Sequence, residues 1–300
     1  MTKEEKKEVY NQTLNIYSGI LANNMEFASG NNEEIKYEFN LKQFKELKEK
    51  YQLEKIAGSG SEFTRSLKLL KYLAPRLTHS SWYDNSIKCN ALRLLEYSLN
   101  NPNHGINCLN KSKILEECCL AIGIYARRVG IMPYSPFDFD NHVVTEIYDR
   151  NLKKWIMLDP TTNGYFIDEK MNPLSLLEMR NKFANDEKIT FITSKDKLLI
   201  ENFEKYYDKY IEVNSYICKN LFYFTIDQDS TFGVTNRILQ FAPKGFSIKN
   251  KTLKNLKYRC DHLPEGLEEW QEMYFSQIRD LEKRDEYTLT DIRSMEKSPI

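Results

Sequence analysis

The segment from 108 to 167 changes from a helical pattern to a run of short strands, and this change limits the fold more than any other feature. Cys108, Leu115 and Ile122 recur at seven-residue intervals, which predicts a helix with these residues on one face. Gly123 is suited to end it, because glycine readily adopts the left-handed conformation of a C-cap. Strand-like segments follow at 124–130, 142–148, 154–158 and 165–167. The order predicts an α+β fold with helices packed on an antiparallel sheet.

The remainder of the chain is predicted to form flanking segments. Helical spacing is present near 3–20, 40–55, 61–74 and 86–100, and again from 173 to 219. Two strand candidates lie within 221–248, and a charged helix with a loose tail is expected after Pro264. We therefore divide the chain into an N-terminal helical segment (1–60), a core (61–190) and a C-terminal α+β extension (191–300).

Charge and cysteine usage narrow the functional class. The 43 basic residues are balanced by 43 acidic ones, which argues against a nucleic-acid partner, because nucleic-acid binders usually carry a basic excess. Residues 1–24 lack the apolar run of a signal peptide, and no segment approaches the roughly 20 apolar residues that span a bilayer. We therefore expect a cytoplasmic protein without a membrane partner. The six cysteines contain no CxxC pair, so we expect free thiols.

Cys108 differs from the other cysteines in its position. It stands at the N-terminal end of the predicted helix, where unpaired backbone N–H groups and the positive end of the helix dipole gather. That setting favours the reactive thiolate form of a cysteine. The same N–H groups can stabilise an oxyanion in a transition state. Cys108 is therefore a candidate nucleophile.

A predicted hairpin brings a histidine and an aspartate together. Strand 142–148 is followed by a polar turn and by strand 154–158. If the hairpin folds about its 150–151 midpoint, His142 lies directly opposite Asp159. Directly paired residues have side chains on the same face, with Cα atoms roughly 4.5–5.5 Å apart. The carboxylate can then orient the imidazole and stabilise its charged form.

Simpler interpretations of these residues remain open. Cys108 can be a core residue of an apolar helix, and Asp159 before Pro160 can be a turn former. A zinc site built from His104, Cys108, His142 and Asp140 is disfavoured, because proline and glycine near 102–105 make a helical HxxxC pair improbable. We therefore expect no metal and no cofactor.

Four motifs in this region fall in order along the chain: Gly-x-x-Cys at 105–108, Gly-Ile-Tyr-Ala-Arg at 123–127, His-Val-Val-Thr-Glu-Ile-Tyr at 142–148, and Trp-x-x-Leu-Asp-Pro-Thr at 155–161. With these motifs the chain resembles the transglutaminase-like superfamily over roughly residues 60–170. The resemblance implies a papain-like core, with the cysteine on a helix that packs against an antiparallel sheet.

The resemblance also implies roles for the three residues. Cys108 would be the nucleophile, His142 the general base and acid, and Asp159 the orienting carboxylate. A second oxyanion donor is implied upstream, and the candidates are Trp82, His104 and Asn107. Arg127 is expected to support the fold by pairing with a carboxylate such as Glu146.

The residues and the resemblance together lead to a functional expectation. We expect a cysteine-dependent amide hydrolase or acyl transferase that acts on a peptide or protein through a thioester intermediate. Hydrolysis is favoured over transfer, because no amine-binding site or calcium loop is marked in the sequence. The alternative is a catalytically inactive interaction module with the same fold. The oligomeric state is left open.

Overall fold

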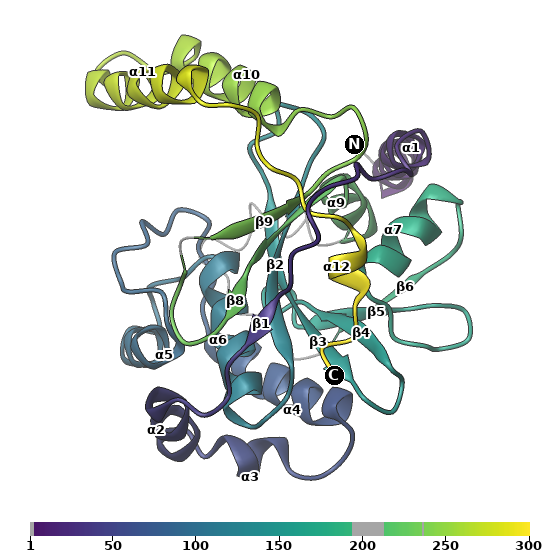
Figure 1. The fold of residues 1–300 in the computed structure, drawn as a ribbon, viewed down its shortest axis with the longest axis vertical. Helices are drawn as coiled ribbons and strands as arrows, with labels where there is room; N and C mark the ends of the chain where they lie inside the picture. Colours follow the sequence, from purple (N-terminus) through teal and green to yellow (C-terminus); the bar gives the residue numbers. More distant parts are fainter. Residues whose placement is uncertain (1–2, 194–212, 236) are drawn as a thin grey trace.

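The computed structural model describes residues 3–193, 213–235 and 237–300, and it is an α+β fold with an antiparallel central sheet (Figure 1). Its helices are α1 (Lys3–Ala22), α2 (Lys42–Lys50), α3 (Leu53–Ala57), α4 (Glu62–Leu73), the 3-10 helix η1 (Ala74–Arg76), α5 (Ala91–Asn100), α6 (Cys108–Ala121), α7 (Leu176–Ala184), α9 (Val213–Asn220), α10 (Ile248–Asp261), α11 (Glu268–Lys283) and α12 (Arg293–Glu296). Its strands are β1 (Lys36–Tyr37), β2 (Ala126–Met132), β3 (His142–Asp149), β4 (Lys154–Leu158), β5 (Gly164–Ile167), β6 (Thr190–Thr193), β7 (Tyr223–Asp227), β8 (Asp229–Ser230) and β9 (Ile238–Phe241).

The central sheet has the strand order β4-β3-β2-β7-β9, and every neighbouring pair is antiparallel. Strands β7 and β9 come from the segment after residue 191, so they join β2 from far along the chain. Two smaller pairs lie outside it: β1 with β8 in parallel and β5 with β6 in antiparallel orientation. The sheet is therefore completed by strands from both the predicted core and the predicted extension.

Helix α6 lies at the centre of the helical layer. It contacts α2, α4 and α5 as well as strands β2 and β3, and twelve of its residues are buried. Asn107 caps its N-terminus by accepting a hydrogen bond from the Asn110 backbone N–H. Gly123 follows its C-terminus with a φ of 80°, as expected for a left-handed cap. Both ends of the helix are thus fixed by the residues that flank it.

A buried ion pair holds the C-terminal tail against the opposite side of the sheet. Arg127 donates to the Glu146 carboxylate at 2.6 Å and to the Met295 carbonyl at 2.7 Å. Its guanidinium lies 3.9 Å above the Trp155 ring, and the Trp155 indole N–H donates to the Lys297 carbonyl. The predicted pairing of Arg127 with Glu146 is confirmed. The expectation of a loose tail is wrong, because these contacts pack it on the sheet.

Two further expectations about local structure are corrected. The helix predicted over 40–55 is broken into α2 and α3, because Gln52 adopts a left-handed conformation with a φ of 52°. The helical pattern predicted over 173–219 is interrupted by β6, which pairs with β5. Residues 194–212 of that range lie outside the described residues. The other predicted helices and strands of the core are present within a few residues of their expected bounds.

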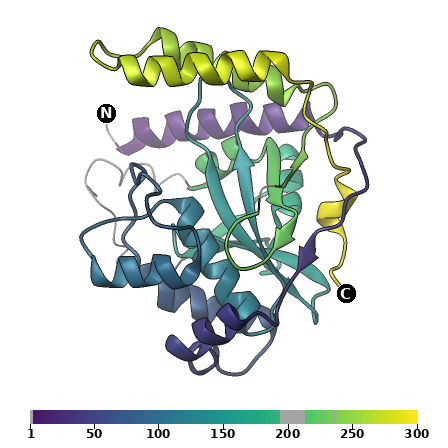
Figure 2. The same ribbon diagram turned by 60° about the vertical axis from the view of Figure 1, so that its left-hand side comes forward.

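Helices α10 and α11 form a hairpin at one end of the molecule, and Figure 2 shows it running above α1. A small apolar core joins the two helices: Leu256, Cys260, Tyr274, Ile278 and Leu281. Asn255 donates to the carbonyl of Pro136, and the Tyr258 ring packs against Phe137 at 5.1 Å. The hairpin is therefore attached to the loop between β2 and β3, which leads into His142.

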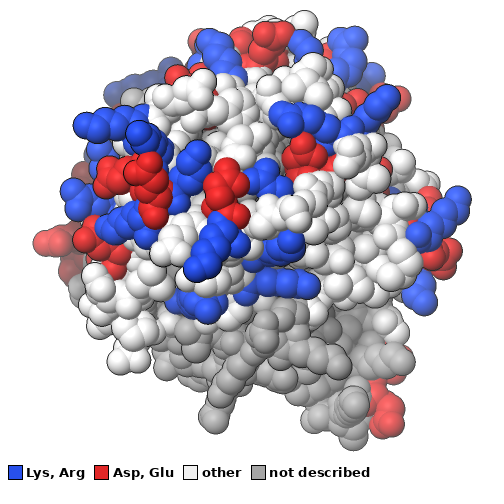
Figure 3. All heavy atoms as spheres, turned by 90° about the horizontal axis from the view of Figure 1, so that it is seen from below, with Lys and Arg blue, Asp and Glu red and all other residues white. Residues whose placement is uncertain are grey.

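Charges of both signs occur on the face drawn in Figure 3. Lys and Arg side chains are interleaved with Asp and Glu side chains over the described atoms of the face in Figure 3. None of the described helices combines the length and the apolar character that a bilayer crossing needs.

Candidate active site

Cys108 is the first residue of α6 and lies at the wall of a cavity of about 900 Å³. Its side chain is partly buried, and its interaction with the His142 imidazole helps to raise the pKa of that ring. His142 is the first residue of β3 and is 3% exposed. The predicted nucleophile and the predicted base are therefore in contact, although 34 positions separate them in the sequence.

His142 also contacts the third predicted residue. Its Nε2 atom lies 2.9 Å from Oδ2 of Asp159, which is fully buried and directly follows β4. Because Nε2 is engaged by the carboxylate, Nδ1 is the ring nitrogen left for the thiol. The imidazole therefore interacts with both the Cys108 sulfur and the Asp159 carboxylate.

The predicted hairpin register is wrong by two residues. Thr145 pairs with Leu158, so Asp159 lies beside Val144 in register and diagonal to His142 rather than directly opposite it. The turn is centred between 151 and 152 rather than between 150 and 151. A shift of two residues keeps both side chains on the same face, whereas a shift of one would separate them. The contact therefore survives the error in register.

The Asp159 carboxylate is held by several donors. Oδ1 accepts the backbone N–H groups of Thr161 and Thr162 at 2.8 and 3.3 Å. Oδ2 accepts the Thr162 hydroxyl at 2.7 Å in addition to the imidazole. Pro160 starts this turn, so the turn-forming role of the aspartate and its contact with His142 coexist. The carboxylate is fixed before any substrate binds.

His142 and Asp159 stabilise each other's charged forms. Burial opposes protonation of the imidazole, but the Asp159 carboxylate and the Cys108 sulfur outweigh it and raise the pKa of His142 to about 10. Burial would raise the pKa of the Asp159 carboxyl, but His142 and the threonine donors hold it below its ordinary value. At neutral pH the site therefore contains an imidazolium between a carboxylate and a sulfur atom.

Backbone N–H groups lie beside the sulfur. No described residue accepts a hydrogen bond from the N–H groups of Cys108 and Leu109, the first two of α6. Asn107 lines the cavity, but its side-chain oxygen caps α6 and its amide nitrogen donates to Asn85. Trp82 lines the cavity with 84% of its side chain exposed, whereas His104 is exposed and does not line it. Of the three predicted oxyanion donors, the structure brings Asn107 and Trp82 to the cavity.

His79 is a cavity residue that the sequence interpretation missed. Its ring is 8% exposed, with Nε2 3.2 Å from the Ser81 hydroxyl and Nδ1 buried without a hydrogen-bond partner among the described residues. Burial and the Lys111 charge lower the pKa of His79 to about 3, so its ring is neutral. Ile106 holds this segment beside α6 by accepting from the Ser80 N–H and donating to the Thr78 carbonyl. No spacing in the sequence links residue 79 to Cys108.

Gly105 permits this close approach. A Cβ atom there would lie 2.6 Å from the His79 carbonyl carbon and the Ser80 nitrogen. The glycine of the Gly-x-x-Cys motif is therefore needed for the segment before Cys108 to pack against residues 78–80.

Lys111 is the second missed residue. It follows Cys108 by one helical turn, it is 1% exposed, and its charge acts on both Cys108 and Asp159. Burial lowers the pKa of Lys111 to about 8, against the attraction of Asp159 and Cys108. The i,i+3 spacing from Cys108 is the signal that points to it.

The other thiols are in different surroundings. Cys118, Cys119, Cys218 and Cys260 are buried, and burial raises the pKa values of the first three. Burial also raises the pKa of the partly buried Cys89. Within the described residues, no group of three or more His, Cys, Asp or Glu side chains has an arrangement that could hold a metal ion. Cys108 is the cysteine with an imidazole partner in this part of the chain.

Comparison with known proteins adds no relative to this picture: no family model, no curated protein and no solved structure matches the chain.

Proposed function

We propose that this protein has a transglutaminase-like core and acts as a cysteine-dependent amide hydrolase or acyl transferase on a peptide or protein. The observation that supports the proposal most directly is that Cys108 and His142 line one cavity and interact with each other, while the Asp159 carboxylate is hydrogen-bonded to the His142 ring. A histidine oriented by a carboxylate and placed beside a thiol is the arrangement that nucleophilic acyl transfer requires. The volume of about 900 Å³ accommodates a peptide segment.

The proposed reaction begins with attack of the Cys108 sulfur on an amide carbonyl carbon. The carbonyl π electrons move to oxygen, and the N–H groups of Cys108 and Leu109 stabilise the resulting oxyanion. The C–N bond then breaks as His142 gives its proton to the departing amine, which leaves a thioester on Cys108. Asp159 keeps the imidazole oriented and charged for this step.

The thioester is resolved by a second nucleophile. Water that gives a proton to His142 attacks the thioester carbonyl, the C–S bond breaks, and a carboxylic acid is released, which restores the Cys108 thiolate beside the protonated His142. A primary amine in the place of water yields a new amide. The first outcome is hydrolysis and the second is acyl transfer, and both use the same three residues.

The proposal is tested by the pH dependence of Cys108 alkylation. Iodoacetamide is applied between pH 5 and 9, and labelling of each cysteine is followed by peptide mass spectrometry. We expect Cys108 to react at pH 6–7, well below the pH of roughly 8.5 at which an ordinary thiol ionises. His142→Ala moves this reactivity towards pH 8–9, while His104→Ala, which removes an exposed histidine outside the cavity, leaves it unchanged. Cys118 and Cys119 are internal controls that stay unlabelled in the folded protein.

Two outcomes separate the alternatives. A Cys108 that stays unreactive up to pH 8–9 contradicts the enzymatic proposal and favours an inactive interaction module. A reactive Cys108 is followed by incubation of the protein with a peptide mixture and a fluorescent primary amine. Amine incorporation that is lost in Cys108→Ala indicates acyl transfer, and new peptide N-termini without incorporation indicate hydrolysis.

A further inference from the structure

The hairpin of α10 and α11 forms a wall of the cavity that contains Cys108. Five of its side chains line this cavity: Tyr258, Arg259, His262, Leu263 and Tyr274. They belong to the part of the chain that the sequence motifs do not cover. The surface that faces a substrate is therefore built from the hairpin as well as from α6 and β3.

Arg259 is the cavity residue whose charge has no counterion in the described part of the chain. Its guanidinium lies 4.3 Å above the Phe139 ring, and no described residue forms an ion pair with it or accepts a hydrogen bond from its side chain. Its Nε atom is buried without a partner. A partly buried guanidinium without an acceptor costs free energy, so a ligand in the cavity that offers an acceptor to this group gains from binding.

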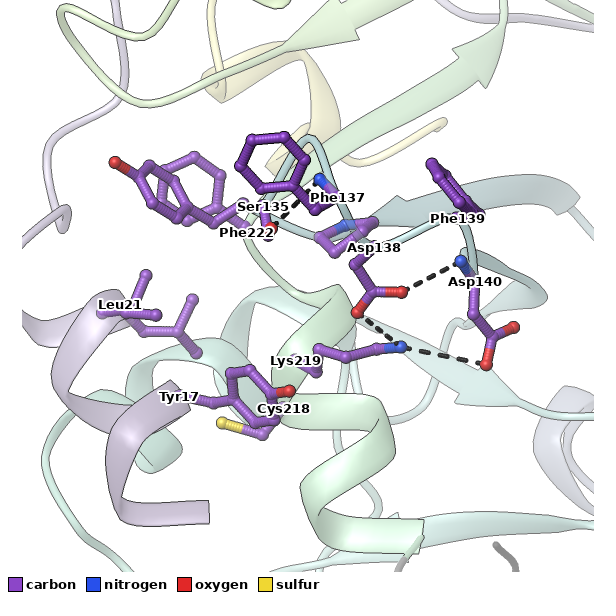
Figure 4. Close-up of a pocket in the computed structure, with 13 residues that line it drawn as sticks. Tyr17, Leu21, Ser135, Phe137, Asp138, Phe139, Asp140, Cys218, Lys219 and Phe222 are labelled. Atoms are coloured by element: carbon purple, nitrogen blue, oxygen red, sulfur yellow. Dashed lines mark hydrogen bonds and ion pairs between the residues drawn. The ribbon is translucent and has the colours of Figure 1, made fainter. Parts of the chain in front are cut away.

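The carboxylates closest in sequence to Phe139 are already engaged. Lys219 lies 2.9 Å from the Asp138 carboxylate and 3.8 Å from that of Asp140, and Tyr216 donates to Asp140 at 3.3 Å. Figure 4 shows Lys219 between the two aspartates, with Phe139 pointing away from their carboxylates. The cavity in Figure 4, of about 530 Å³, shares Phe139 and Asp140 with the cavity of Cys108. Both aspartates are thus paired with Lys219, and Asp140 lines the cavity that Arg259 faces without forming an ion pair with it.

We propose that Arg259 binds a carboxylate of the peptide substrate and so makes this site selective for acidic peptides. The inference rests on the proposed function, because it assigns the substrate class of the same cavity. The planar guanidinium fork matches a carboxylate with two parallel hydrogen bonds, and the Phe139 ring holds the fork in place. The carboxylate belongs either to an Asp or Glu side chain or to a peptide C-terminus.

The test measures binding rather than turnover. Fluorescein-labelled hexapeptide mixtures, each with one position fixed as Glu or Gln, are titrated against Cys108→Ala and followed by fluorescence anisotropy. Each mixture is prepared with a free and with an amidated C-terminus. We expect either one Glu position or the free C-terminus to bind about tenfold more tightly than its neutral counterpart. A fixed-position preference identifies a side chain as the source, and a preference for the free C-terminus identifies the terminal carboxylate.

Arg259 variants show whether this preference comes from the proposed residue. Arg259→Gln, combined with Cys108→Ala, reduces the preference to less than about twofold. Lys254→Gln removes the same charge from an exposed position of α10 outside the cavity and leaves the preference intact. Arg259→Lys keeps the charge and loses the fork, so it retains an intermediate preference, and it replaces the Gln variant if that one does not fold.

The outcomes distinguish this inference from the proposed function. Equal binding of Glu and Gln mixtures and of both C-termini, no binding by any mixture, or a preference that survives Arg259→Gln overturns the role of Arg259. A Cys108 that is unreactive towards iodoacetamide, together with an Arg259-dependent carboxylate preference, overturns the proposed enzyme and leaves the carboxylate site standing. A reactive Cys108 without that preference overturns the carboxylate site and leaves the proposed enzyme standing.

Discussion

The Ser112 hydroxyl donates a hydrogen bond of 2.7 Å to the backbone carbonyl of Val143, which joins the helix of the candidate nucleophile to the strand of the candidate base. Ser112 lies one turn after Cys108, and Val143 is the residue next to His142. A second bond runs in the opposite direction, from the Thr145 hydroxyl to the Ser112 carbonyl at 3.0 Å. Both bonds are buried, so they fix the distance between α6 and β3 where the sulfur meets the imidazole.

Ser112→Ala is expected to slow the alkylation of Cys108 at pH 6.5 by about three- to tenfold, because loss of one buried hydrogen bond of about 1 kcal/mol loosens the contact with His142. The rate is measured with iodoacetamide on the folded protein. Ser98→Ala is the matched control, since Ser98 is also a buried helical serine but its hydroxyl has no hydrogen-bond partner among the described residues. Equal rates in the two variants would show that this bond does not position the cysteine.

Asp159→Asn is expected to lower the free energy of unfolding in a pH-dependent manner. The folded pKa of His142, about 10, lies above its unfolded value of 6.5, so its contribution is complete below pH 6.5 and is lost as the pH rises through 10. The folded pKa of Asp159 is lowered, so its contribution is present above the unfolded value of 3.8 and is lost as the pH falls through the folded value. The difference between wild type and variant is therefore largest at about pH 5–6.

Urea titrations at pH 3, 5.5 and 10.5 test this profile. The destabilisation by Asp159→Asn should be of the order of 2–4 kcal/mol at pH 5.5 and smaller at both extremes. Asp168→Asn is a suitable control, because Asp168 caps an exposed turn away from the cavity. A destabilisation of the same size at all three pH values would contradict the assignment of a charged His142–Asp159 pair.

The part of the site that is local in sequence was predictable, and the part assembled over long range was not. Helical spacing and Gly123 locate α6, and alternating residues around a polar turn locate the β3–β4 hairpin. The register was missed because Asp149 accepts the N–H groups of Asn151 and Leu152, and Lys153 adopts a left-handed conformation. These two features place the turn later than its polar residues indicate.

The local sequence pattern does not predict which residues form the walls of the cavity. His79 reaches the site through pairing of its segment with Ile106, and Arg259 reaches it through the packing of α10 on the loop before His142. Both depend on contacts between segments far apart in the chain. Hydrophobic periodicity predicts which face of an element is buried and does not predict which elements meet.

Lys111→Met is expected to raise the free energy of unfolding by about 1–3 kcal/mol at pH 7, because it removes a buried charge at nearly constant side-chain length. The folded pKa of Lys111, about 8, lies below the unfolded value of 10.5, so the cost of burying the charge is complete below pH 8 and disappears as the pH rises through 10.5. The increase in the free energy of unfolding of Lys111→Met should therefore become smaller between pH 8 and 10.5. Lys71→Met, on the exposed face of α4, is the control and should show no such pH dependence.

Lys111 should also influence how fast Cys108 reacts with a negatively charged reagent relative to a neutral one. Iodoacetate and iodoacetamide differ in one negative charge, so the ratio of their alkylation rates reports the local potential at the sulfur. Removal of the cation one turn away is expected to lower the ratio of iodoacetate to iodoacetamide by about threefold. A ratio that does not change in Lys111→Met would mean that the lysine charge does not act on the cysteine.

Glu146→Gln is expected to destabilise the fold strongly, because it leaves the buried Arg127 guanidinium without its counterion. Glu146 accepts two hydrogen bonds from Arg127 and one from the Leu176 N–H, and all of them are buried. Breaking such a pair typically lowers the free energy of unfolding by about 3–5 kcal/mol. The loss is measured from the shift of the midpoint of urea unfolding. Glu62→Gln breaks a more exposed pair with Arg150 and should cost less than about 1 kcal/mol. Similar losses in the two variants would contradict the view that the Arg127–Glu146 pair anchors the C-terminal tail to the sheet.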